Sequence, residues 1–215
     1  MDKKQKFVIT INRELGSGGR TVGMKLAEKL NVAFYDKLLI RELEKKFNLS
    51  VDEIEKMKAD KHQWWTEFKK VFAANAQNAN ELWYYQMMTT GPEMDFVTTD
   101  DMFEAEKEIL RNIAAEESCV IAGRSGFFVF ANHPNHLSIL IQAPMKYRIE
   151  RIMKKQDLNE KDAEKAIKKV DDMRETYVKK YTGTSRYDTR NYDLVINMEG
   201  KTEDEVVELI LSYIG

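Results

Sequence analysis

The 215-residue chain is poor in cysteine and histidine, and both shortages exclude a class of protein. Its single cysteine, Cys119, can form no internal disulfide, which indicates a reducing compartment. Because Cys119 lies within an apolar run, we interpret it as a small buried hydrophobe rather than a nucleophile. The three histidines, His62, His133 and His136, lack the spacing of metal ligands, so no resident metal site is expected.

Net charge and long apolar runs are also lacking. The 34 Lys and Arg residues nearly balance the 36 Asp and Glu residues, which does not favour nucleic acid as a partner. No apolar stretch reaches the roughly 18 to 20 residues that span a bilayer, and residues 1–6 are not followed by a signal-peptide core. We therefore expect a cytoplasmic protein with no membrane partner.

The most informative feature present is the beginning of the chain. An apolar run at 7–11 leads directly into a glycine-rich stretch and then an amphipathic helix. Glycines allow a tight turn with inward N–H groups, and a helix N-terminus adds positive potential, so together they suit an anion. This order predicts a phosphate-binding loop made of Gly16, Ser17, Gly18, Gly19, Arg20 and Thr21.

Three interpretations of this loop remain open. A dinucleotide fingerprint would need a glycine where Thr21 stands, although Asp36 lies where that fingerprint places its ribose ligand. A nucleoside triphosphate site needs a cation and a hydroxyl at the helix start; Arg20 can neutralise β/γ-phosphate charge and Thr21 can bind magnesium. A plain solvated glycine turn is the third. The triphosphate site is favoured, although the lysine of the pattern G-x-x-x-x-G-K-[ST] is absent.

The rest of the chain alternates helical periodicity with short apolar runs. Strands are expected at 7–11, 31–36, 119–122, 136–141 and 193–196, with helices between them. Because the apolar runs are continuous, the pattern predicts an α/β fold with a parallel sheet covered on both faces. We expect one domain over 1–215, with a helical insertion at about 50–102 on the acceptor side. Ligands of such folds bind beyond the carboxyl ends of the strands, where Asp36 and Gly123–Ser125 fall.

A basic segment at about 145–190 is predicted to be a lid. Residues 146–190 hold 14 Lys and Arg against 9 Asp and Glu, a local excess of five positive charges. Phosphoryl transfer needs dispersed positive charge around the γ-phosphate. Each basic residue alone fits an exposed helix face, but the group favours a phosphate-closing lid. Its candidate catalytic residues are Arg148, Arg151 and Arg174, with Asp171 and Asp172 available to hold them.

An aromatic set within the insertion has two interpretations. These side chains either stack an acceptor base or pack between helices, and a subunit contact that would make the protein a homo-oligomer stays open. The set comprises Trp64, Trp65, Trp83, Tyr84 and Tyr85.

The order of these features resembles the cytidylate kinase-like family, relatives of cytidylate kinase among the P-loop nucleoside monophosphate kinases. The similarity covers most of the chain: the glycine loop, Phe34–Asp36, the insertion, the strand ending in Gly123-Arg124, the basic lid and Asn191–Asn197. The stretch 11–20 is the distinctive part. The resemblance implies a three-layer α/β/α P-loop fold and magnesium-dependent phosphoryl transfer from ATP to a nucleoside monophosphate, CMP or dCMP among them, or to another small acceptor.

Departures from cytidylate kinase bear on the site. Aligned by overall spacing, the lysine position falls on Gly19 and the first glycine on Arg13; aligned by charge, the lysine becomes Arg20, which is the assignment we make. A nucleotide-binding protein without catalysis is therefore the alternative function, and an NAD-type enzyme is the second.

The acceptor side departs as well. Cytidylate kinase carries Gly-Arg-Asp where this chain has Gly123-Arg124-Ser125. Arg124 can still grip an acceptor phosphate bidentately. Asp36 can accept a hydrogen bond from the acceptor, orient water on magnesium, or simply cap a helix.

Overall fold

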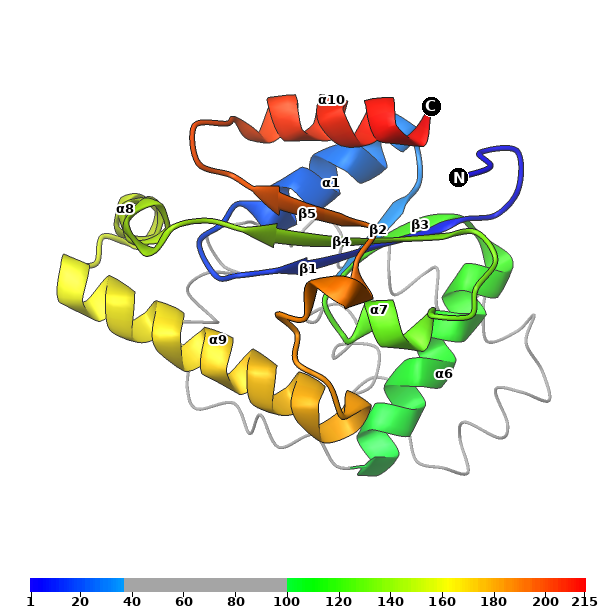
Figure 1. Ribbon diagram of the computed structural model, residues 1–215, viewed down its shortest axis with the longest axis horizontal. Helices are drawn as coiled ribbons and strands as arrows, with labels where there is room; N and C mark the ends of the chain where they lie inside the picture. Colours follow the sequence, from blue (N-terminus) through cyan, green and yellow to red (C-terminus); the bar gives the residue numbers. More distant parts are fainter. Residues whose placement is uncertain (37–99) are drawn as a thin grey trace.

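The computed structural model describes residues 1–36 and 100–215, which form three layers around a parallel sheet (Figure 1). The five strands lie in the order β2-β3-β1-β4-β5, and every neighbouring pair is parallel. The strands are β1 (Val8–Arg13), β2 (Ala33–Asp36), β3 (Cys119–Ala122), β4 (His136–Gln142) and β5 (Leu194–Asn197). The expected parallel sheet is therefore confirmed.

Helices cover both faces of the sheet. In Figure 1, α1 (Gly19–Leu30) and α10 (Glu203–Ile214) lie above it, and α6 (Asp100–Glu116) and α7 (Gly126–Val129) lie below it. Beyond the carboxyl ends of the strands lies α8 (Met145–Gln156), from which α9 (Glu160–Thr182) runs beneath the sheet toward α6. A 3-10 turn, η1 (Thr189–Asn191), precedes β5.

Helices connect the described strands as expected, and α7 is a helix that the sequence did not predict. Its four residues are too few to show helical periodicity in a sequence. The predicted insertion at about 50–102, with its aromatic set, lies outside the described residues except for 100–102, which begin α6. None of the helices in the described ranges combines the length and apolarity needed to cross a membrane.

The core explains why the strand sequences are continuously apolar. Along β1, Ile9 and Ile11 pack in one cluster with Leu26 of α1, whereas Val8 packs in another with Ile113 of α6. Successive strand residues point to opposite faces, so burial of both faces requires apolar residues at consecutive positions.

A third cluster ties the glycine loop to the basic segment. Leu15 of the loop is buried against α8 and α9. Its partners are Ile149, Ile152, Ala163, Ile167 and Val170. Packing at Leu15 thus holds α8 and α9 beside the loop.

Two helix starts are stabilised by side chains of neighbouring residues. The Asn159 side chain accepts the Asp162 N–H at 2.9 Å at the start of α9, and Thr202 forms a capping box with Glu205 at the start of α10.

Candidate functional site

The glycine loop turns sharply between β1 and α1. Gly16 and Gly18 have φ angles of 81° and 87°, and α1 begins at Gly19. A side chain at position 16 would place its Cβ 2.8 Å from the carbonyl oxygen of Arg148. The Ser17 hydroxyl donates to the Glu14 carbonyl at 2.9 Å and closes the turn. Gly16 is therefore required both by backbone conformation and by the close approach of α8.

Arg20 and Asp36, predicted for the donor and acceptor sides, lie together in the structure. The Arg20 Nε donates to Asp36 Oδ2 at 2.8 Å, and both side chains are buried. The guanidinium also lies over the Phe34 ring, 5.8 Å from its centroid. This pair joins the first turn of α1 to the end of β2.

Thr21 and Arg151, also predicted site residues, meet at the start of α1. The Arg151 Nη2 donates to the Thr21 hydroxyl at 3.2 Å, and its Nη1 lies 2.5 Å from Glu203 Oε1. The basic helix α8 therefore reaches the end of the glycine loop through this arginine.

Asp171 of α9 gathers the remaining predicted cations beside the loop. Its Oδ2 accepts from Arg148 Nη1 at 2.5 Å, and its Oδ1 lies 3.5 Å from Arg174 Nη1. The same Oδ1 accepts the Leu15 backbone N–H at 3.0 Å. Asp171 thus holds two arginines, as expected from the sequence, and also fixes a loop amide.

Arg186 is a further member of this cluster, and the sequence did not indicate that it belongs to the site. Its side chain is fully buried, with Nη1 3.4 Å from Asp171 Oδ1 and Nη2 donating to the Arg13 carbonyl, which also accepts from Arg174 at 3.0 Å. Burial, and next the nearby Arg174 charge, lower the pKa of Arg186. Arg186 lies between α9 and η1, where no periodicity marks a buried position.

Arg124 follows β3 in an unusual backbone conformation. Gly123, Arg124 and Ser125 have successive φ angles of 86°, 57° and 53°. The left-handed region costs a non-glycine residue roughly 1–3 kcal/mol, and such strain clusters at functional sites. The Arg124 guanidinium forms a buried ion pair with Glu106 and lies 5.2 Å from the centroid of the Tyr177 ring.

Neither Glu106 nor Tyr177 was assigned to the site from the sequence. The Tyr177 hydroxyl donates to Glu106 Oε2 at 2.6 Å, so α9 and α6 both contact the arginine that follows β3. A signal for Glu106 existed, since it lies on the apolar face of α6 between Phe103 and Leu110, where a charge is unexpected.

The glycine loop and the Gly123–Ser125 turn meet at one edge of the sheet. β1 and β3 are neighbours, with Ile11 opposite Ala122, and the Gly123 N–H donates to the Ile11 carbonyl at 3.0 Å.

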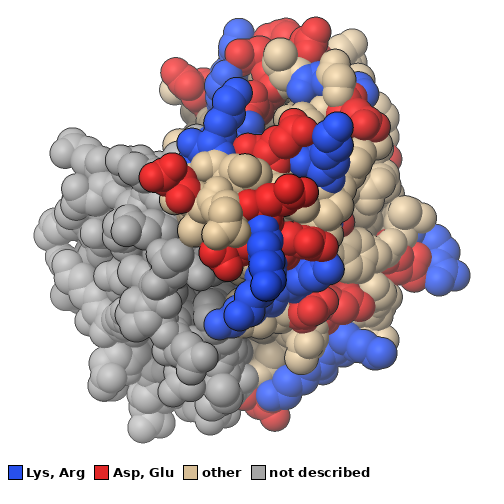
Figure 2. Space-filling model, turned by 90° about the vertical axis from the view of Figure 1, so that its left-hand side faces the viewer, with Lys and Arg blue, Asp and Glu red and all other residues tan. Residues whose placement is uncertain are grey.

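Figure 2 views the molecule from the end where the loop lies. On the described part of that face, basic and acidic side chains are intermixed and form no continuous basic surface.

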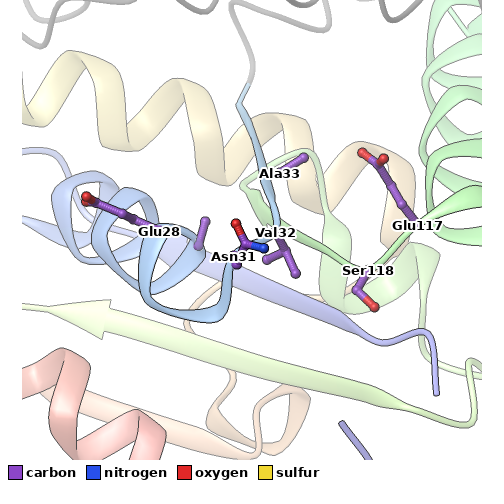
Figure 3. Close-up of a pocket in the computed structure, with 7 residues that line it drawn as sticks. Glu28, Asn31, Val32, Ala33, Glu117 and Ser118 are labelled. Atoms are coloured by element: carbon purple, nitrogen blue, oxygen red, sulfur yellow. The ribbon is translucent and has the colours of Figure 1, made fainter. Parts of the chain in front are cut away.

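A separate hollow lies at the opposite edge of the sheet (Figure 3). It measures about 470 Å³ and lies where α1 ends and where β2 and β3 begin. Its lining residues are Ala27, Glu28, Asn31, Val32, Ala33, Glu117 and Ser118. It lies away from the carboxyl ends of the strands and is no part of the predicted phosphate site.

Comparison with known proteins decides the family. The model of the cytidylate kinase-like family matches residues 8–200. The chain belongs to the cytidylate kinase-like family. Together with the parallel sheet and the helices on both of its faces, this family gives the chain a three-layer α/β/α P-loop fold.

Individual relatives agree with the family along nearly the whole chain. A cytidylate kinase of Sulfolobus acidocaldarius is 24% identical over 213 residues, 96% of this chain and 93% of the relative. A cytidylate kinase of Pyrococcus horikoshii is 26% identical over 98% of this chain and 90% of its own length. The crystal structure of an uncharacterized protein from Eubacterium ventriosum has a TM-score of 0.64, 24% identity and coverage of 97% and 98% of the two chains, and it shares the fold.

Proposed function

We propose that this protein transfers the γ-phosphoryl group of ATP to a nucleoside monophosphate, with CMP and dCMP as the first acceptors to test. The observation that carries the proposal is the meeting of the glycine loop with Arg124 at the carboxyl ends of adjacent strands. Cytidylate kinases that align with nearly all of the chain support a nucleotide as the acceptor.

In this reaction the glycine loop binds the donor ATP and Arg124 binds the acceptor. An oxygen of the acceptor phosphate forms a bond to the γ-phosphorus, the bond from that phosphorus to the β,γ-bridging oxygen breaks, and ADP leaves. The loop amides and the N-terminus of α1 bind the donor phosphates. Arg124, oriented by Glu106 and Tyr177, grips the acceptor phosphate with its planar fork.

The basic segment supplies dispersed charge around the transferred group. Arg148 and Arg174 are held beside the loop by Asp171, and Arg151 lies against Thr21. Stabilising the charge of the γ-phosphoryl group in the transition state is the main catalytic requirement of phosphoryl transfer. In this proposal the segment at 145–190 is a lid that brings these guanidinium groups onto the phosphates.

The residues present fit magnesium bound together with ATP. The half-buried Thr21 hydroxyl, in the first turn of α1, is the kind of hard oxygen ligand that Mg²⁺ takes along with water and substrate phosphates. Bound there, the ion would neutralise charge on the β- and γ-phosphates. Asp36 is occupied by Arg20, so its proposed part is to orient that arginine at the end of β2.

An acceptor screen tests this function. Calorimetry with magnesium first measures ATP binding, and ADP release is then followed with CMP, dCMP, UMP, AMP and GMP. Turnover with a nucleoside monophosphate is expected. Absence of ATP binding would contradict the proposal, whereas binding without turnover on any of the acceptors would indicate a nucleotide-binding protein without catalysis.

A pair of variants tests the acceptor residue. Arg124→Lys keeps the charge but loses the fork, so the KM for the acceptor should rise about tenfold while ATP affinity stays unchanged. Arg111→Gln is the matched control, because Arg111 lies on the exposed face of α6 and, within the described part of the chain, pairs with Glu108 on the same helix. Equal acceptor KM values for the two variants would show that Arg124 does not bind the acceptor.

A further inference from the structure

Arg13, the last residue of β1, carries an inference about the missing lysine of the loop. In the standard pattern a lysine at the start of the helix reaches the β- and γ-phosphates. Here α1 starts with Gly19, which has no side chain. The question is which cation of this chain reaches the phosphates instead.

The space beside Gly19 is filled by Arg13. A side chain at position 19 would place its Cβ 2.6 Å from the Cβ of Arg13 and 3.1 Å from the Cβ of Ile141. A lysine at 19 and an arginine at 13 therefore exclude each other sterically. With Arg13 placed as it is, glycine is the residue that fits at position 19.

The Arg13 side chain ends beside a second glycine. A Cβ at Gly123, which has a φ of 86°, would overlap the Arg13 Nη1. The buried side chain thus runs from Gly19, at the glycine loop, to Gly123, at the turn that carries Arg124. Its guanidinium lies between the proposed donor and acceptor sites.

The backbone of Arg13 is also held in place. Its carbonyl accepts hydrogen bonds from Arg174 and Arg186 of the Asp171 cluster. Arg20 directs its Nε away from the glycine loop, to Asp36 at the end of β2. Position and orientation therefore favour Arg13 over Arg20.

We infer that Arg13 supplies the cation at the donor phosphates, a part played by the lysine in the standard loop. The standard loop has its positive charge at the first residue of the helix, whereas this chain has glycine there and an arginine at the last residue of the preceding strand. A guanidinium can bind two phosphate oxygens at once, which an ammonium group cannot do in the same geometry. This inference rests on the proposed function, and it reassigns the part that charge alignment gave to Arg20.

Four variants of the full chain test the inference by MgATP calorimetry. Arg13→Gln should weaken MgATP binding about 10- to 100-fold, since hydrogen bonds to charged groups contribute about 1.5–3 kcal/mol. Arg13→Lys should retain binding to within about tenfold, because it keeps the charge. Arg20→Gln should change binding less than about threefold. The double variant Arg13→Gly, Gly19→Lys, which restores the standard arrangement, should bind MgATP within about tenfold of the wild type.

The outcomes separate the inference from the proposed function. Folded Arg13→Gln protein that binds MgATP like the wild type, or Arg20→Gln protein that alone loses binding although circular dichroism shows it to be folded, would overturn the part given to Arg13 and leave the kinase intact. If Arg13→Gln does not fold, the double variant decides, and a folded double variant that fails to bind MgATP overturns the inference. Arg13-dependent binding without transfer to any nucleoside monophosphate would overturn only the acceptor. A wild type that does not bind MgATP would overturn both.

Discussion

Replacing Asp171 with Asn tests whether the arginine cluster beside the loop depends on one buried charge. The carboxylate serves Arg148 and Arg186, whose side chains are 8% and 0% exposed, as well as the less buried Arg174. Asparagine keeps the shape and one acceptor for the Leu15 N–H but removes the negative charge that these arginines share; Glu14 Oε2, 3.7 Å from Arg148 Nε, still faces Arg148. Breaking a buried ion pair by removing one partner costs about 3–5 kcal/mol, a large part of a typical stability of about 5–15 kcal/mol.

Urea unfolding followed by circular dichroism measures the loss in the free energy of unfolding. Thermal unfolding gives a second readout: for a chain of this length each kcal/mol shifts Tm by about 2–4 °C, so Asp171→Asn should lower Tm by roughly 6–20 °C. Asp172→Asn is the matched control, because Asp172 is exposed on the same helix, and it should stay within about 0.5 kcal/mol of the wild type. A loss below about 1 kcal/mol for Asp171→Asn would refute the view that its charge holds the cluster.

Three further predictions concern the strand edges and the loop. Burial lowers the pKa of His136, which is hydrogen-bonded to Thr10, to about 4 from 6.5. Between pH 4 and pH 6.5 the unfolded state therefore binds more protons than the folded state. The free energy of unfolding should fall by up to about 3 kcal/mol as the pH drops from 6.5 to 4. Urea titrations of His136→Gln should show a smaller fall over the same pH range. Gly16→Ala should destabilise by at least about 2 kcal/mol more than Gly183→Ala, because both glycines have positive φ but only a Cβ at 16 meets a backbone oxygen; equal losses in thermal unfolding would contradict the contact with α8. Ser125→Gly should raise the free energy of unfolding by about 1 kcal/mol. Glycine adopts the left-handed backbone conformation of Ser125 without strain, and the buried Ser125 hydroxyl has no hydrogen-bond partner among the described residues. A lower free energy of unfolding in a urea titration would show that this strain is not relieved.

The fold could be predicted because local sequence and tertiary structure agree in this chain. Continuously buried strands such as β4 occur where both sheet faces are covered, and Asn159 and Thr202, which cap α9 and α10, are residue types typical of helix starts. The short helix α7 could not be found, because its four residues follow from the turn at Gly123–Ser125 rather than from any periodic pattern.

The site could be predicted as a set of strand ends but not as a set of contacts. Asp171 was available to hold arginines on sequence grounds, since it lies three residues before Arg174 on one helix. The pairing of Arg20 with Asp36, and the burial of Arg186, depend on how β2 and the segment after α9 return to the loop. Partners separated widely along the chain leave no periodic signal, so their charges appear in the sequence only as single polar residues.

The steric exclusion between positions 13 and 19 shows the same limit. Charge alignment favours Arg20 as the replacement for the lysine, because Arg20 and Thr21 stand next to each other as the lysine and hydroxyl do in the standard pattern. Alignment by overall spacing leaves Arg13 as the alternative cation, and the approach of the Arg13 Cβ to Gly19 is the observation that favours it. Close approaches of this kind are properties of the packed backbone and cannot be read from residue types.

The measurement that tests the central claim most directly is transfer of the γ-phosphate of labelled ATP to a nucleoside monophosphate. With magnesium and CMP or dCMP present, a kinase should move the label into the corresponding diphosphate in amounts equal to the ADP formed. The same result with another nucleoside monophosphate would keep the reaction and change the acceptor. Label that stays in ATP, or appears only as inorganic phosphate with every nucleoside monophosphate, would contradict phosphoryl transfer at this site.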